Sequence, residues 1–598
     1  MTLLAACSAD EPSNNGVDDK KPVGDVAYMT INISDVNNLR PAPQRAPSTA
    51  DDFELGSDYE HKVTSARFFF YDNAGNYVMA ASMGNPSFGT PGDNENNNIE
   101  YIGTENILVL EGLTSTGYPR FMVTVLNAPD FVCPETNITD AATALQQYAT
   151  AFPDKQSNGT FVMSTSSYLS ADDLNHDDTF YYATRLRDED FYLSAEEALT
   201  NGNAVKVYVE RLAAKVTLNI SENAPQTTYT DAEGVEHVIY KLDQSLAGAG
   251  NGDENDEDKA VTDLYVEVEG WALNATNPQS YLCKQFDGWS ESDLWADWNE
   301  SKRHRSYWAK SSVYGDAALN ADPVNNSSYP LNYSLVSNLS RALGEVEYCY
   351  ENTNSTDMIL EASKTEAGKM LVKPARVTHV ALKARVCDAN GASIDMVRYN
   401  GLLFRTEAYK NYLLNQLKSK GELNFYTYDA AANEYTQVGT AALALESDGT
   451  GKMGQVVVVP AEGLKLYYRT GDKDENGNNV YGEVDAPEYT GKTFAATIAS
   501  VQNAEHPAVN FNDGASVYYI PVEHQTYEVD NTEEGYYGVV RNHAYRLTVS
   551  KFSKVGHGVF DPDNETVTPD EPEDPLYYVG VNISVLSWRI VNQDNIVL

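Results

Sequence analysis

Three groups of residues in this 598-residue chain have types and spacings that could do chemistry. Leu4-Ala5-Ala6-Cys7 has the form of a bacterial lipobox, in which small residues before a cysteine allow signal-peptide cleavage and the thiol carries lipid. Arg40 and Arg45 are the basic residues of a Pro/Ala-rich stretch, 37–52, which predicts an exposed loop that an Arg-specific protease can reach. Asp472 to Glu483 matches the calcium-loop pattern D-x-[DN]-x-[DN]-G-x5-E.

Two of these groups, the calcium-loop pattern and the lipobox, also have a simpler interpretation. The calcium pattern has Asn479 where such loops usually carry an apolar residue, and the flanking LKLYYRT and VDAPEYTGK indicate strands rather than helices. An Asn/Gly-rich β-hairpin therefore explains Asp472 to Glu483 without a metal ion. The lipobox could be a chance tetrapeptide, but the polar, Pro- and Gly-containing stretch 8–25 after Cys7 is typical of a flexible tether. We expect the numbered chain to begin inside the signal peptide.

Catalytic motifs are absent from the sequence, which contains no G-x-S-x-G, H-E-x-x-H or G-x-x-x-x-G-K-[ST]. Five scattered cysteines form no C-x-x-C pair, and no Cys/His cluster has zinc-site spacing. A paired-carboxylate glycosidase cannot be identified from spacing alone. We predict no enzyme activity, no cofactor and no metal site.

The charge balance excludes another class of function. The chain has 42 Lys+Arg against 87 Asp+Glu, a formal net charge of −45, whereas nucleic acid and anionic lipid need a basic footprint. Forty Tyr residues, with 18 Phe and 6 Trp, distinguish the chain from an aromatic-poor disordered acidic protein. We expect a folded protein without nucleic-acid partners, linked to a membrane only through the lipid of its precursor.

Alternation of apolar and polar residues dominates the rest of the chain and predicts an all-β fold, most simply tandem sandwiches. Helical patterns are few and short, at 141–152, 194–199 and 407–418. The predicted strands are 26–33, 66–71, 120–126, 205–220, 264–268, 377–384, 455–459, 516–522, 545–549 and 579–585.

The C-terminal tail, 576–598, is strongly apolar and follows an acidic, Pro-rich linker, 559–575. An apolar strand without a fixed partner is an aggregation hazard unless something covers it. Two interpretations stay open: the tail returns to its own sandwich, or it donates a strand to another subunit. The candidate donor residues are Tyr578, Val579, Val581, Ile583, Val585, Trp588, Ile590, Val591, Ile596 and Leu598.

Several stretches, in this order, give the chain a resemblance to the Mfa1-like and FimA-like fimbrillins, the subunits of type V fimbriae of Bacteroidales. The Mfa1-like branch fits better. The stretches are VYVERLAAKV (207–216), VEVEGWALNATNPQSYLCK (266–284), HRSYWAKS (304–311), YCYENTN (348–354), ARVTHVALKARV (375–386), GYYGVVRNHAYRLTVSKFSKVGHG (535–558) and the tail.

The resemblance implies an architecture of two Greek-key, transthyretin-like β-sandwich domains with few short helices and a C-terminal donor strand. The great length of the chain suggests insertions. The expected organisation is a truncated signal and tether at 1–25, an N-terminal strand and protease-sensitive loop at 26–52, an N-terminal sandwich at 53–205, a C-terminal sandwich with insertions at 206–558, the linker at 559–575 and the donor tail at 576–598.

The resemblance also implies an assembly mechanism. A precursor lipidated at Cys7 would reach the outer membrane, and a trypsin-like protease would cut after Arg45 or Arg40 and release the first strand. The tail of a neighbouring subunit would then fill the groove. The implied product is a homopolymer at the cell surface, with accessory anchor and tip subunits, that supports adhesion to host or bacterial ligands or biofilm formation. A shaft subunit is the expectation; the alternatives are a tip subunit or a monomeric surface lipoprotein that binds glycans.

Overall fold

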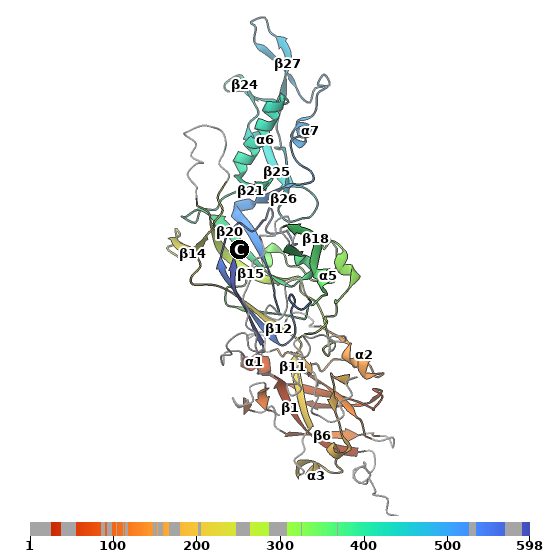
Figure 1. Cartoon of the computed structure of the whole chain (residues 1–598). Coiled ribbons are helices and arrows are strands. Elements are labelled where there is room, and N and C mark those ends of the chain that lie inside the picture. Colours follow the sequence, from red (N-terminus) through yellow and green to blue (C-terminus); the bar gives the residue numbers. More distant parts are fainter. Residues whose placement is uncertain are drawn as a thin grey trace, which may run out of the picture.

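The computed structural model confirms the all-β prediction. It describes residues 26–36, 56–84, 90–91, 99–102, 105–111, 113, 118–147, 152–153, 159–166, 180–200, 205–246, 263–285, 308–323, 326–366, 369–524, 534–568 and 589–597. The molecule is elongated, and its sheets follow one another along the long axis (Figure 1). β1, β6 and β11 lie at one end, β12, β15 and β20 in the middle, and α6, β24 and β27 at the other end.

The first sheet belongs to the N-terminal part of the chain. Its order is β3-β2-β7-β9-β11-β1-β5-β4, with β10 paired to β7 and β6 paired to β1. Its strands are β1 (Val26–Val36), β2 (Ser65–Tyr71), β3 (Tyr77–Gly84), β4 (Thr90–Pro91), β5 (Ile99–Ile102), β6 (Glu105–Glu111), β7 (Phe121–Leu126), β9 (Met163–Thr165), β10 (Thr184–Arg185) and β11 (Val205–Arg211). The short helices α1 (Asp58–His61), α2 (Ile138–Ala142) and α3 (Ala195–Thr200) accompany it.

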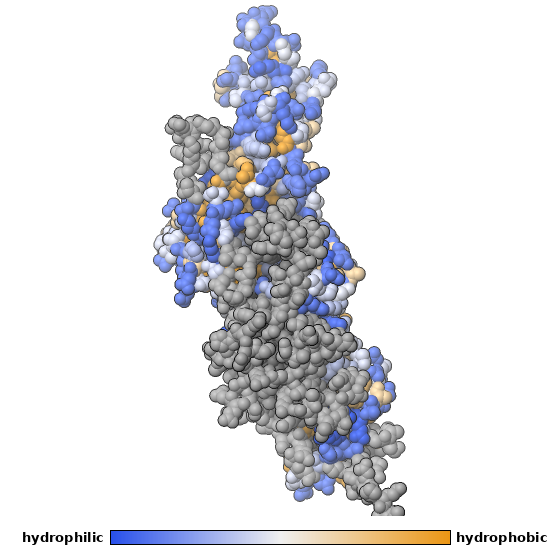
Figure 2. All heavy atoms as spheres, viewed as in Figure 1, coloured by the Kyte–Doolittle hydropathy of each residue, from blue (hydrophilic) through white to orange (hydrophobic). Residues whose placement is uncertain are grey.

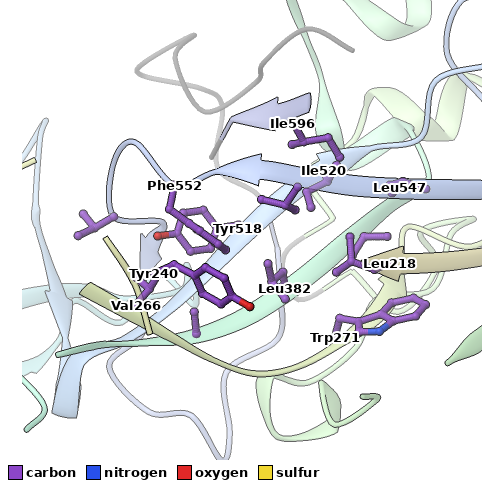
Figure 3. Packing of buried hydrophobic residues seen from close by; sticks show 14 of the residues in the cluster. Leu218, Tyr240, Val266, Trp271, Leu382, Tyr518, Ile520, Leu547, Phe552 and Ile596 are labelled. Atoms are coloured by element: carbon purple, nitrogen blue, oxygen red, sulfur yellow. The ribbon is translucent and has the colours of Figure 1, made fainter. Parts of the chain in front are cut away.

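Two sheets form the middle of the molecule and share one large apolar core. One has the order β17-β12-β31-β33 and the other β13-β14-β15-β20-β30-β32. Figure 3 shows side chains of both sheets meeting, among them Leu218 of β12, Trp271 of β15 and Leu382 of β20. The strands are β12 (Ala214–Ile220), β13 (Gln226–Thr230), β14 (Glu236–Lys241), β15 (Tyr265–Asn274), β17 (Val346–Cys349), β20 (His379–Cys387), β30 (Ala515–Pro521), β31 (His543–Lys551), β32 (His557–Gly558) and β33 (Arg589–Val597).

A separate unit is inserted between β20 and β30. It contains a five-stranded sheet, β22-β21-β29-β26-β25, and a four-stranded sheet, β24-β23-β27-β28. Helix α6 (Thr406–Lys420) buries Tyr409, Leu413 and Leu417 in the core of this unit and ends at Gly421, whose φ of 69° suits glycine. The strands are β21 (Met396–Tyr399), β22 (Leu402–Arg405), β23 (Tyr426–Asp429), β24 (Glu434–Gln437), β25 (Leu443–Ser447), β26 (Gln455–Pro460), β27 (Tyr467–Lys473), β28 (Asn479–Glu483) and β29 (Ala508–Phe511), with α7 (Phe494–Ala499).

Two of the predicted elements differ from the structure, many observed strands such as β3, β6 and β13 were not predicted, and the predicted strand 579–585 lies outside the described residues. The run 205–220 is two strands, β11 and β12, which continue the chain from the first sheet into the middle of the molecule. The helix predicted over 141–152 is wrong, because α2 ends at Ala142 and β8 (Leu145–Gln146) pairs with β16 (Ser280–Tyr281). The Cys283 and Leu282 amides donate to the carbonyls of Ala142 and Ala144, so a distant segment replaces the next helical turn.

The visible surface differs in hydropathy between parts of the molecule. Figure 2 shows that the unit inserted between β20 and β30 is mainly hydrophilic on this face, whereas apolar residues gather where that unit meets the middle of the molecule. No helix among the described residues is long and apolar enough to cross a membrane.

Candidate functional site: the position of strand β1

Strand β1, the predicted N-terminal strand, lies inside the first sheet rather than at its edge. It runs parallel to β11, with Ile31 opposite Val205 and Ile33 opposite Val207. On its other side it runs antiparallel to β6, with Tyr28 opposite Val109, and near its end it pairs with β5. Both ladders of hydrogen bonds therefore depend on a segment that stands before the predicted cleavage sites.

The apolar face of β1 belongs to a core. Met29 has no exposed surface and packs in a cluster with Leu108 and Leu110 of β6 and with Val205, Val207 and Val209 of β11. In the sequence of β1, Ile31 and Ile33 follow Met29 at two-residue spacing, and Tyr28, Thr30 and Asn32 alternate with them. The aromatic part of the same cluster comes from Phe68, Phe70, Tyr118 and Phe191.

Loss of β1 would therefore expose two kinds of surface at once. The facing edges of β11 and β6 would present unpaired N–H and C=O groups, a ready template for another strand. The apolar core residues between these two edges would become accessible to water, at a free-energy cost of about 25 cal/mol for each Å² of apolar surface exposed. We call this position, between β11 on one side and β6 and β5 on the other, the β1 slot.

The residues at which the precursor is predicted to be lipidated and cleaved are not among those described. Cys7, Arg40 and Arg45 all lie outside the described residues, and the chain is described again from Gly56. Their roles in lipidation and cleavage stay predictions.

The C-terminal tail is described only for β33. Ile590, Val591 and Ile596 lie opposite Ala544, Tyr545 and Val549 of β31, to which β33 runs parallel. Ile596 is buried in the large core, and Figure 3 shows it above Ile520, near Leu547. In this chain β33 is thus seated on its own subunit, in a different part of the molecule from β1. The other candidate donor residues lie outside the described residues: Tyr578, Val579, Val581, Ile583, Val585, Trp588 and Leu598.

The segment with the calcium-loop pattern forms the hairpin β27–β28. The Asn478 side chain donates to one Asp474 carboxylate oxygen at 3.0 Å, and the backbone amides of Asn476 and Asn478 donate to the other at 2.9 and 2.8 Å. These bonds lower the pKa of Asp474, with the Asn478 side chain contributing most. Glu483 instead forms an ion pair with Lys465 at 2.6 Å. No cluster of three or more His, Cys, Asp or Glu side chains suited to a metal ion occurs in the described part of the chain.

A buried polar junction, which the sequence reasoning missed, joins the first sheet to the middle of the molecule. Burial would raise the pKa of Glu60, but the Lys215 ammonium at 3.1 Å and the Tyr348 hydroxyl at 2.6 Å hold it below its usual value. Arg211, fully buried, donates to the Glu60 carbonyl and to the Asn542 side chain. The only signal in the sequence is that charged residues interrupt the apolar run VYVERLAAKV.

Comparison with known proteins adds a match at the C-terminal end. Residues 509–594 match the family model described as the major fimbrial subunit protein type IV, fimbrillin, C-terminal. This range includes β30, β31 and part of β33, and it confirms the fimbrillin resemblance drawn from the sequence. No curated protein matches the chain significantly.

Two solved structures show distant likeness. The tip fimbrial protein Mfa3 from Porphyromonas gingivalis, with a C-terminal truncation, is 13% identical at a TM-score of 0.25, over 63% of this chain and 83% of that one. A fimbrial assembly protein from Parabacteroides distasonis is 10% identical at a TM-score of 0.25, over 69% of this chain and 98% of that one.

Proposed function

We propose that the chain is the shaft subunit of a type V fimbria assembled by strand exchange, a structural protein and not an enzyme; the match of residues 509–594 to the fimbrillin C-terminal model supports this. The precursor is a lipoprotein anchored through Cys7 in the outer membrane. A trypsin-like protease cuts after Arg45 or Arg40 and releases β1, and the tail of the next subunit enters the β1 slot. The fimbria then projects from the cell surface and carries accessory anchor and tip subunits.

The observation that carries this proposal is the interior position of β1. Removal of an edge strand would leave the rest of a sheet paired, whereas removal of β1 separates β11 from β6 and opens the core that contains Met29. A strand from another subunit restores both ladders and the apolar burial together. Polymerisation then needs no nucleotide, because the exchange is driven by pairing and burial.

A tail of this kind favours a shaft over a tip subunit, since a tip subunit accepts a strand but need not donate one. The rival function is a monomeric surface lipoprotein that keeps β1 and binds glycans. Its support is the tyrosine content of the chain, which equally suits packing on sheets.

Limited proteolysis tests the proposal. The purified chain is treated with trace trypsin, its new N-terminus is found by mass spectrometry, and SDS-resistant ladders are sought. The same assay is applied to a chain lacking residues 576–598 and to Arg40→Ala and Arg45→Ala variants. We expect cleavage after one of the two arginines, followed by ladders that need the tail. Cleaved protein that stays monomeric, or that polymerises equally well without the tail, contradicts strand donation.

A further inference from the structure

The C-terminal tail contains a second copy of the β1 sequence pattern. Aligned without a gap, VAYMTINISDV (26–36) and LYYVGVNISVL (576–586) share a tyrosine at Tyr28 and Tyr578 and the Asn-Ile-Ser triplets at 32–34 and 582–584. We infer that residues 576–586 of a second subunit occupy the β1 slot in the register of β1 itself. This inference rests on the proposed function, which requires a donated strand but does not say which part of the tail enters or in what register.

The alternation of the two segments agrees position by position. Met29, Ile31 and Ile33 correspond to Val579, Val581 and Ile583, so the face that fills the core stays apolar and β-branched residues predominate on it. The opposite face corresponds equally well, because tyrosine, asparagine and serine recur there at the same spacing. A shift by one residue would turn every apolar side chain to the other face.

The walls of the slot fit this register. In β1's place, Val581 would lie opposite Val205 and Ile583 opposite Val207, both buried residues of β11. Val585 would take the position of Asp35 opposite Val209, which is buried as well. An apolar residue would thus take the place of a charged one. The donated segment therefore places an apolar residue opposite buried Val209 at the far end of the slot.

One position is larger in the tail than in β1. Tyr577 corresponds to Ala27, which lies opposite Leu110 near the start of the β6 ladder. A register shifted by two residues keeps the same face inward, but it loses the match of the Asn-Ile-Ser triplets. It is the main competing arrangement, and the experiment must separate it from β1's own register.

Disulfide mapping makes this distinction. Val109 of β6 lies opposite Tyr28 and is 44% exposed, so a cysteine placed there can react. Opposed residues of antiparallel strands bring their Cβ atoms to about 4.5–5.5 Å, near the range in which a disulfide closes. The cysteines of the described chain, Cys133, Cys283, Cys349 and Cys387, are buried. Uncleaved Val109→Cys/Tyr28→Cys protein is the control for a bond within one chain.

The test pair is Val109→Cys/Tyr578→Cys in the cleaved, polymerising protein. Oxidation should give ladders that survive boiling in SDS and collapse with a reductant. Two further pairs report other registers. Val109→Cys/Gly580→Cys reports a register shifted by two residues, and Val109→Cys/Tyr577→Cys reports one shifted by a single residue. Polymers that cross-link through position 580 or 577 instead overturn the inference and leave strand exchange intact. Cleaved subunits that form no polymer overturn the proposed function itself.

A second pair of variants provides a readout that does not depend on disulfide geometry. Val581→Asp places a charge on the face that fills the slot, whereas Asn582→Asp places it on the outer face. We expect Val581→Asp to lower polymer yield at least about tenfold and Asn582→Asp to leave it within about twofold of the wild type. Equal effects of the two substitutions contradict the proposed register.

Discussion

Buried carboxyl groups in the middle of the molecule make stability depend on pH in opposite directions. Burial raises the pKa of Glu523 to about 8, although the Tyr536 hydroxyl donates to it at 3.2 Å. Glu60 shows the opposite shift, because Lys215 and Tyr348 keep its pKa low despite burial. The two groups share a chemical type, and the charge beside each decides which protonation state is favoured.

The raised pKa of Glu523 predicts a loss of stability as pH rises. The folded chain holds the Glu523 proton more tightly than the unfolded chain does. The contribution of this group to the free energy of unfolding is therefore complete below about pH 4.5 and is lost as the pH rises toward about 8. Glu523→Gln, which stays neutral, should therefore have a higher Tm than the wild type at pH 8 and a similar Tm at pH 4.5. Thermal unfolding at both pH values checks this, with the exposed Glu505→Gln as control; a constant Tm difference would contradict it.

At the buried polar junction that contains Glu60, we expect the loss of Lys215 to lower the free energy of unfolding strongly. Lys215→Met leaves the Glu60 carboxylate buried without its cation, and such losses cost about 3–5 kcal/mol. Denaturant unfolding should show this loss, and Glu60→Gln/Lys215→Met should recover much of it because the buried carboxylate without its lysine partner is gone. If the double variant were no more stable than the single one, lost packing rather than the unpaired charge would be the cause.

At the scale of the elements, the proposed assembly requires β1 in the precursor and removes it before polymerisation. Met29→Ala removes a fully buried side chain, and we expect the uncleaved chain to lose about 2–5 kcal/mol. After cleavage the residue is gone, so polymers of the variant should resist SDS and heat as well as wild-type polymers do. Chemical unfolding of the precursor and melting of the polymer measure the two effects. Weaker variant polymers would indicate that β1 remains in the fimbria.

At the scale of the whole molecule, a net charge of −45 opposes the approach of a second copy. Salt screens this repulsion over a Debye length of about 10 Å at 0.1 M and about 30 Å at 0.01 M. Polymerisation of the cleaved protein should therefore be severalfold faster in 150 mM than in 10 mM sodium chloride, as light scattering can measure. Sucrose of equal osmolality is the control, and a rate that falls with salt would show that specific ion pairs dominate the encounter.

Some local elements and the resemblance to fimbrillins could be predicted from the sequence alone. Alternating runs predicted central strands such as β1, β7 and β20, because period-two burial is a property of the strand itself. Many other strands, among them β3, β6 and β13, were not predicted. The resemblance to fimbrillins came from motifs along the whole chain, and the match at 509–594 confirmed it. The helix 141–152 failed because its carbonyls bond to the distant segment 280–283, which no local pattern reports.

The positions of the elements relative to one another could not be read from the sequence and come from the three-dimensional structure. It placed β1 between β11 and β6, split 205–220 into strands of two sheets, and brought Glu60 to Lys215 across about 150 residues. Such pairings depend on which edges and apolar faces are left to cover once the chain collapses, so they are set by many distant residues together. The same physics explains why the pattern shared by 26–36 and 576–586 gains meaning only once the β1 slot is seen.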